Sequence, residues 1–141
     1  MSVRIIDHSE EVREAIDRQL DDALDAIGVH IEGEATDALE MKPRRVDTGL
    51  LRNSIAYALS GQPANISTYT SDDGSKSGSY SGTAPDDPPN KKAVYIGTNV
   101  EYAIYVSEGT QKMTPNRFLK NAVELNKDQI KGYIEDALKN G

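Results

Sequence analysis

The feature that most constrains the fold is a run of helical periodicity from Glu10 to Met41. Apolar residues recur in it at steps of three or four, the spacing that lines one face of an α-helix. They are Val12, Ile16, Leu20, Leu24, Ile27, Ile31, Ala35 and Leu39. Pro43 disfavours the helical conformation at Lys42, so we predict one amphipathic helix over residues 10–41. At 1.5 Å per residue it would be about 48 Å long. That exceeds what one small domain needs, and part of the helix is expected to project or to pack against another subunit.

Two details of this helix stay open. Its N-cap is either Asp7, with Glu10 three residues later, or Ser9. Gly28 and Gly33 lie inside it, each costing about 1 kcal/mol relative to alanine. They indicate either a bend or break near residues 28–33, or close packing of the helix backbone against a neighbour.

After the helix, the segment Val46 to Ile55 is expected to turn the chain inward. Asp47 is the natural N-cap of a short helical turn, which would point Leu50 and Leu51 into the core. A strand follows, because Ile55, Tyr57 and Leu59 alternate with smaller residues at a period of two. We predict this capped turn and strand over residues 47–60, and a second strand over residues 93–98 from Val94 and Ile96.

The segment 61–92 between these strands is rich in Gly, Ser, Asp and Pro and has too few apolar residues to form a core. It is predicted to be a mobile loop or a hairpin. In the hairpin, residues 66–70 would pair with residues 77–81 across the turn at Asp72, Asp73 and Gly74.

Two further helices are predicted. Tyr102, Tyr105 and Val106 have helical spacing, and Gly109 closes a short helix over residues 101–108. Thr114 as N-cap and Pro115 at the first position begin a C-terminal helix over residues 115–139. Its apolar stripe is Phe118, Leu119, Ala122, Val123, Ile130, Ile134, Ala137 and Leu138.

These elements predict a single α+β domain over residues 1–141. A small, mostly antiparallel sheet would pack against the long N-terminal helix and the C-terminal helix, with the polar loop or hairpin projecting from its edge. The chain has one Phe and no Trp, so the core is expected to be mainly aliphatic.

Composition excludes several classes of function. A net charge of -7 argues against binding nucleic acid through the overall field of the protein. The absence of cysteine removes disulfides and thiolate sites. No stretch approaches the ~20 apolar residues that span a bilayer, nor is there a standard export signal, so no membrane partner is expected. The one basic cluster, Lys42, Arg44, Arg45 and Arg52, is expected to compensate a helix dipole rather than to bind phosphate.

The sharpest catalytic candidate is the tripeptide Asp47-Thr48-Gly49, which carries the catalytic aspartate in aspartic proteases. There it follows a hydrophobic strand in a nearly all-β fold, whereas here it follows a helix, so capping explains the same residues.

His8 and His30 lack the spacing of metal ligands. Asp72-Asp73-Gly74 lacks the alternating oxygen ligands of a calcium loop, and no glycine-rich phosphate loop is present. We assign no catalytic, metal or cofactor residue.

Three sequence blocks in fixed order resemble a known family. They are residues 46–55 (VDTGLLRNSI), residues 94–106 (VYIGTNVEYAIYV), and Gly109-Thr110 through Pro115 to Phe118-Leu119. The set is similar to the head-tail joining, or tail-completion, proteins of long-tailed double-stranded DNA phages, also described as minor tail or minor capsid proteins. Two departures stand out. First, an acidic residue and then an aromatic residue commonly precede Gly-Thr in the family, where this chain has Ser107 and Glu108. Second, the chain has a long polar segment over residues 61–92, a region that varies among members of the family.

The resemblance implies a structural, non-enzymatic role. Copies would form a homo-oligomeric ring in the virion neck, assembled in the bacterial cytoplasm, and would contact neighbouring neck or tail proteins. The alternatives are a tail-tube terminator or a tail assembly chaperone and, further away, a protease using Asp47. The residues expected in the cap and core are Asp47, Thr48, Gly49, Leu50, Leu51, Ile55, Ile96, Tyr102, Tyr105, Phe118 and Leu119. The long helix and the 61–92 segment supply the candidate interface residues Ile27, Ile31, Ile66, Tyr69 and Tyr80.

Overall fold

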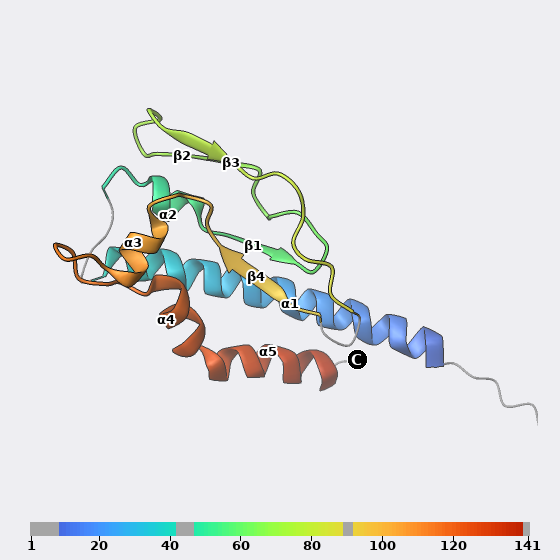
Figure 1. Ribbon diagram of the computed structural model, residues 1–141. Helices are drawn as coiled ribbons and strands as arrows, with labels where there is room; N and C mark the ends of the chain where they lie inside the picture. The colour runs from blue at the N-terminus through green and yellow to red at the C-terminus, as the bar shows by residue number, and fades with distance from the viewer. Residues whose placement is uncertain (1–8, 42–46, 89–91, 140–141) are drawn as a thin grey trace, which may run out of the picture.

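The computed structural model describes residues 9–41, 47–88 and 92–139, with side chains from residue 17 onward. The predicted α+β fold is confirmed: a long N-terminal helix, small antiparallel sheets and C-terminal helices (Figure 1). Asp7 and the side chain of Ser9, the two candidate N-caps, lie outside what is described. Within these ranges, no helix is both long and apolar enough to span a bilayer.

Helix α1 (Ser9–Glu40) is the spine of the molecule, and its first turns extend beyond the other elements in Figure 1. From Ile27 onward its apolar stripe is buried, with Ile31, Ala35 and Leu39 fully so, while Leu20 and Leu24 are partly buried. The helix continues through both glycines without a break. Gly28 packs against the ring of Tyr57, which leaves no room for a Cβ atom there. A Cβ atom added at Gly33 would meet nothing within 4 Å. Close packing therefore explains Gly28 but not Gly33.

The first sheet pairs β1 (Ala56–Leu59) with β4 (Val94–Gly97) in antiparallel register, from Ala56 opposite Gly97 to Leu59 opposite Val94. Both strands pack on α1. The predicted alternation of buried and exposed residues is not kept at the start of β1. Ile55 and Ala56 are consecutive and both buried, because Ile55 still belongs to the end of the preceding helix α2 (Leu50–Ser54).

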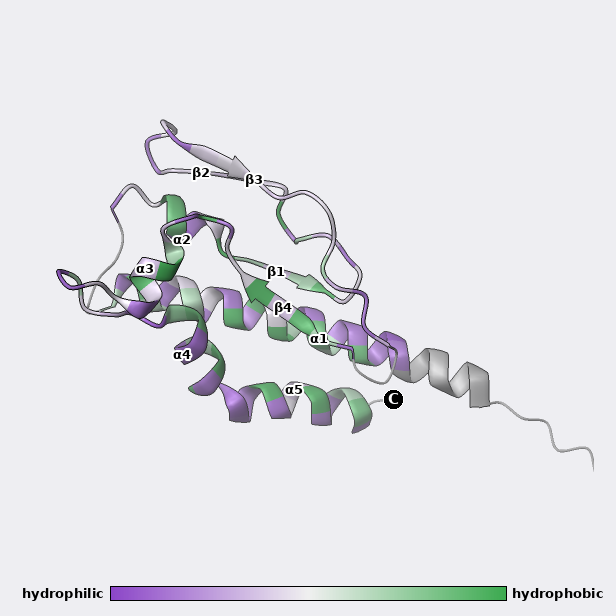
Figure 2. Cartoon of the chain, in the orientation of Figure 1, coloured by the Kyte–Doolittle hydropathy of each residue, from purple (hydrophilic) through white to green (hydrophobic). Residues whose placement is uncertain are grey.

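The second sheet is a hairpin of β2 (Thr68–Thr70) and β3 (Ser77–Ser79), the pairing expected across residues 72–74. It stands apart from the first sheet, above α2 in Figure 1. Figure 2 shows little hydrophobic colour on β2 and β3, in contrast to α2 and β4. Few apolar side chains of the hairpin are available to bury, and Tyr69 is the one in its strands that is buried.

The predicted C-terminal helix over residues 115–139 is wrong in two respects. It is divided into α4 (Phe118–Glu124) and α5 (Lys127–Lys139), and α4 begins after Arg117, not at Thr114 and Pro115. The division has a physical cause at Asn126. Its buried side chain donates to the carbonyl of Ala122 (2.7 Å), and its Oδ1 lies 3.2 Å from Nε2 of His30 on α1. Side-chain amides that bond to nearby backbone compete with helix continuation in this way.

The core lies between α1 and a layer formed by α2, α3 (Ala103–Glu108) and α4. Leu51, Ile55 and Phe118 are buried in it as expected, and Ile96 and Leu119 pack against it partly buried, while Leu50 is half-buried. The placement of Tyr102 and Tyr105 in the core is wrong, since they are 43% and 59% exposed. Ala103 and Val106 face inward instead, because a helix this short buries only one narrow face.

Candidate functional site

The turn that leads into α2 is built on Gly49 rather than on Asp47. Gly49 occupies the N-cap position with φ 83°, a left-handed conformation that favours glycine, and no side chain caps α2. The prediction of Asp47 as the cap is therefore wrong, and Asp47 is exposed. Thr48 does bond locally: its hydroxyl accepts from the N–H of Leu50 (3.3 Å), and its carbonyl accepts from the N–H of Asp72 in the hairpin (2.7 Å).

Arg52 on α2 connects three elements. Its guanidinium donates to Glu40 at the end of α1 (2.6 Å) and to Asp72 in the hairpin turn. Asn53 also donates to Asp72 (3.0 Å), and these hydrogen bonds, from Asn53 first and Arg52 second, lower the pKa of the Asp72 carboxyl. Of the basic cluster only Arg52 is described; it lies in the last turn of α2 and forms ion pairs with Glu40 and Asp72.

Two tyrosines fasten the hairpin to the body. Tyr69 is 8% exposed, lies against Tyr80 with ring centroids 5.5 Å apart, and donates its hydroxyl to Asn99. Tyr80 donates to the backbone carbonyl of the buried Ser54. Both were candidate interface residues, and the structure uses them within one chain.

Two of the other candidate interface residues are not free for a partner. Ile27 and Ile31 are 3% and 0% exposed in the core, so their assignment to an interface is wrong. They lie on the buried stripe of α1, which the rest of the core covers. Ile66 is half-buried before β2.

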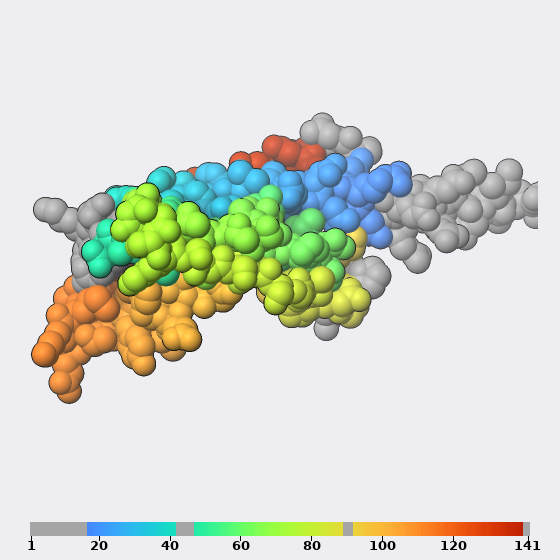
Figure 3. Space-filling model, turned by 90° about the horizontal axis from the view of Figure 1, so that it is seen from above, coloured from blue at the N-terminus to red at the C-terminus, as the bar shows by residue number. Residues whose placement is uncertain are grey.

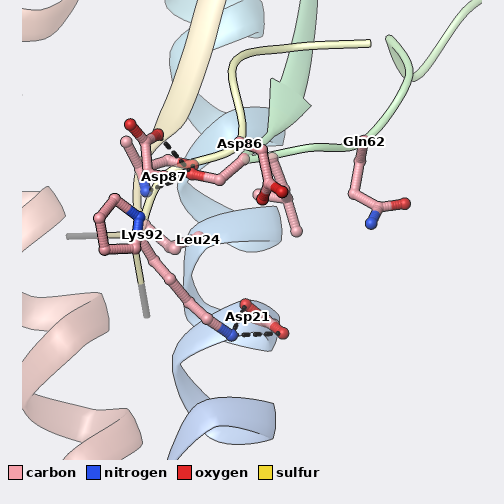
Figure 4. Close-up of a pocket in the computed structure, with 10 residues that line it drawn as sticks. Asp21, Leu24, Gln62, Asp86, Asp87 and Lys92 are labelled. Carbon is pink, nitrogen blue, oxygen red and sulfur yellow. Dashed lines mark hydrogen bonds and ion pairs between the residues drawn. The ribbon is translucent and has the colours of Figure 1, made fainter. Parts of the chain in front are cut away.

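A hollow lies between α1 and the segment that returns from the hairpin (Figure 4). Its volume is about 780 Å³, and its charged lining consists of Asp21, Asp86, Asp87 and Lys92. Lys92 pairs with Asp21 (3.1 Å). Asp87 accepts from Tyr95 (2.6 Å) and Ser60 (2.8 Å), and these two hydrogen bonds lower its pKa.

The chemistry of this hollow is that of a polar groove. A carboxyl with a lowered pKa is ionised near neutral pH, so Asp87 is not a proton donor there. The hydroxyl of Ser60 bonds a carboxylate and the backbone of Ala93, and none of the ten lining residues is a histidine that would activate it. Across the described ranges, no three His, Cys, Asp or Glu side chains are grouped to hold a metal ion.

What the surface does present is exposed apolar side chains, at two main places. On α3 and just before it, Tyr102, Ile104 and Tyr105 are 43%, 63% and 59% exposed. Along α4 and α5, Val123, Leu125 and Leu138 are 40%, 79% and 55% exposed. Grouped apolar side chains on a surface are typical of protein contact sites. The α3 group was not predicted from the sequence, where Tyr102 and Tyr105 were placed in the core.

Charge is unevenly divided over the same surface. Residues 17–40 of α1 carry eight acidic side chains and one basic one. Residues 101–120 carry three basic side chains, Lys112, Arg117 and Lys120, and two acidic ones, Glu101 and Glu108. Arg117 lies 3.9 Å from Glu108. The molecule therefore has an acidic spine and a weakly basic end.

Comparison with known proteins gave no match: no protein-family model, no curated protein and no solved structure matches this chain significantly.

Proposed function

We propose that this chain is a structural protein of a phage virion, which joins head and tail in the neck as a homo-oligomeric ring. The observation that carries the proposal is the convergence of the three family-like blocks. Leu51, Val106 and Phe118, one from each block, share a single core cluster. The blocks therefore form one packed unit, as residues that define a common fold would.

Further contacts join the same blocks. The hydroxyl oxygens of Ser54 and Thr98 lie 2.6 Å apart, and the N–H of Asn116 donates to the carbonyl of Val106 (2.8 Å). Gly109, with φ 80°, lies so close to Pro115 that a side chain would collide there. The residues that carry the resemblance thus form the body of the fold, while the variable segment 61–92 forms the appended hairpin.

The surface is consistent with an assembly role rather than a catalytic one. The described part offers exposed apolar groups on α3 and on α4–α5, and the hollow beside Asp87 has no histidine among its ten lining residues to activate Ser60. A net charge of -7 also suits a ring through which DNA passes without adhering.

The test is the composition of purified particles from the tailed phage or prophage that encodes this chain. We expect the protein in intact virions, at the head-tail junction, in a fixed number of copies. Deleting its gene should leave filled heads and free tails unjoined. Complementation with Asp47→Asn should restore joining fully, because Asp47 has no catalytic role.

Other results would point elsewhere. A protein that is needed for tail formation but absent from particles would be an assembly chaperone. A protein found at the end of free tails, with tails of abnormal length in its absence, would be a tail-tube terminator. Failure of Asp47→Asn to complement, with native folding and an unprocessed virion protein, would support the protease alternative.

A further inference from the structure

The face of α1 that points away from the core has an open position at its centre. Its exposed residues include Asp22, Val29, Gly33 and Asp37, spaced at three to four residues or multiples of that, and we call this face the α1 back. Val29 is 56% exposed, and an added Cβ at Gly33 would meet nothing within 4 Å. Glycine inside a helix lowers its stability relative to alanine. Because no neighbour in the monomer requires glycine at position 33, we look for the cause in a contact with another molecule.

The same helix shows what a glycine of this kind can hold. At Gly28 the ring of Tyr57 lies directly on the backbone, where a Cβ atom would collide with it. The hydroxyl of Tyr57 then donates to Asp25, one turn earlier on α1 (2.9 Å). Gly33 lies one and a half turns further along, with Val29 and Asp37 on either side, and no residue of the described chain covers it.

A matching surface exists at one end of the molecule. We call residues 101–120 the α3 lobe, and Figure 3 shows it as the orange projection at one end. It exposes Tyr102, Ile104 and Tyr105. Among the described side chains, neither Lys112 nor Lys120 has an ion-pair partner within 4 Å. The lobe thus combines exposed tyrosines with available positive charge.

We propose that the α3 lobe of one copy docks on the α1 back of the next, with the ring of Tyr105 over Gly33. The second copy is the occupant that charge favours, because the α1 back presents the carboxylates of Asp22 and Asp37, while the α3 lobe presents Lys112 and Lys120. The lobe as a whole carries three basic side chains against two acidic ones. This inference rests on the proposed function, since it assigns the contact through which the ring would form. The contact joins two different surfaces, so repeating it produces a closed ring or an open filament rather than a two-fold dimer.

Two variants block one side of the contact each. Gly33→Leu fills the open position and should leave the monomer at least as stable, because nothing lies within 4 Å. Ile104→Ser with Tyr105→Ser removes the two most exposed apolar side chains of the lobe. The matched control is Leu125→Ser with Leu138→Ser, which removes two equally exposed apolar side chains from α4–α5. If the lobe variant melts below the wild-type protein, Lys112→Glu with Lys120→Glu takes its place.

The measurement is the mass of the full-length protein by light scattering and sedimentation over a range of concentrations. We expect concentration-dependent association of the wild-type and control proteins, weaker at high salt. Each blocked variant alone should stay monomeric at concentrations where the wild-type protein associates, with an association constant at least tenfold lower. Mixed together, the two blocked variants should form a one-to-one complex and stop there, because one copy supplies an intact lobe and the other an intact α1 back.

Three results would overturn the inference. They are a wild-type protein that stays monomeric up to its solubility limit, a blocked variant that associates as the wild-type protein does, and a mixture that gives no heterodimer. Loss of association in the control variant alone would move the contact to α4–α5. None of these bears on the presence of the chain in virions, so the proposed function fails or holds by its own test.

Discussion

At the scale of single residues, the two glycines of α1 have opposite environments and should respond oppositely to alanine. Gly28→Ala places a methyl group into the ring of Tyr57, and overpacking of this kind costs about 1–3 kcal/mol. Gly33→Ala meets open space and should raise the free energy of unfolding by about 0.5–1 kcal/mol, through better helix propensity and a less flexible unfolded chain. Urea denaturation of dilute monomer measures both, and a shift of the two variants in the same direction would contradict these environments.

Asp73, in the hairpin turn, gives a prediction for pH. Its carboxylate accepts from the hydroxyl and the N–H of Ser75 and from the hydroxyl of Ser71, which lowers its pKa to about 2. A folded-state pKa below the unfolded one contributes stability that is complete above about pH 4 and lost as the pH falls towards 2. Asp73→Asn should therefore unfold more easily than the wild-type protein at neutral pH, by thermal melting, and the difference should shrink to nothing near pH 2. A difference that is constant with pH would mean that the turn does not depend on the charge of Asp73.

At the scale of elements, the hairpin depends on polar contacts and should detach without unfolding the body. Arg52→Ala removes the ion pair between α2 and Asp72, together with that to Glu40, while the core residue Leu51 beside it is untouched. Exposed ion pairs add little to global stability, so the melting temperature should change little. Proteolytic cleavage within residues 61–88 should become several-fold faster, because it follows local opening.

The control for the hairpin is Lys131→Ala, which removes a surface ion pair with Glu135 on α5. It should leave the cleavage rate within 61–88 unchanged. Equal cleavage of the Arg52→Ala and wild-type proteins would show that the ion pair of Arg52 does not hold the hairpin.

The elements also show how far sequence reasoning reaches. The period of α1 and the turn residues of the hairpin are local signals, and both elements are where those signals place them. The division between α4 and α5 depends on Asn126 meeting His30, a contact between residues 96 positions apart that no local pattern contains. In α3, spacing alone cannot choose between the face of Tyr102 and Tyr105 and the face of Ala103 and Val106. The candidate contact surface was missed for that reason.

At the scale of the whole molecule, one core holds the three family-like blocks together, and Phe118 is its largest side chain at 1% exposure. Phe118→Ala should lower the free energy of unfolding by about 3–5 kcal/mol, a large part of the ~5–15 kcal/mol typical of a domain. Leu125→Ala, at 79% exposure, is the control and should stay within about 0.5 kcal/mol of the wild-type value. Denaturant titration measures both, and similar losses in the two variants would mean that the core is not centred on Phe118.

The hairpin leaves the body after Leu59 and returns before Val94, and these two residues are paired neighbours in the first sheet. An insertion whose ends meet side by side can grow, shrink or be exchanged without altering the course of the body on either side. Natural variation in length should therefore accumulate here, while the strands and helices around Phe118 keep their spacing. Related proteins could then change which partners their outer surface contacts through insertions and deletions in this one segment, with little effect on the stability of the fold.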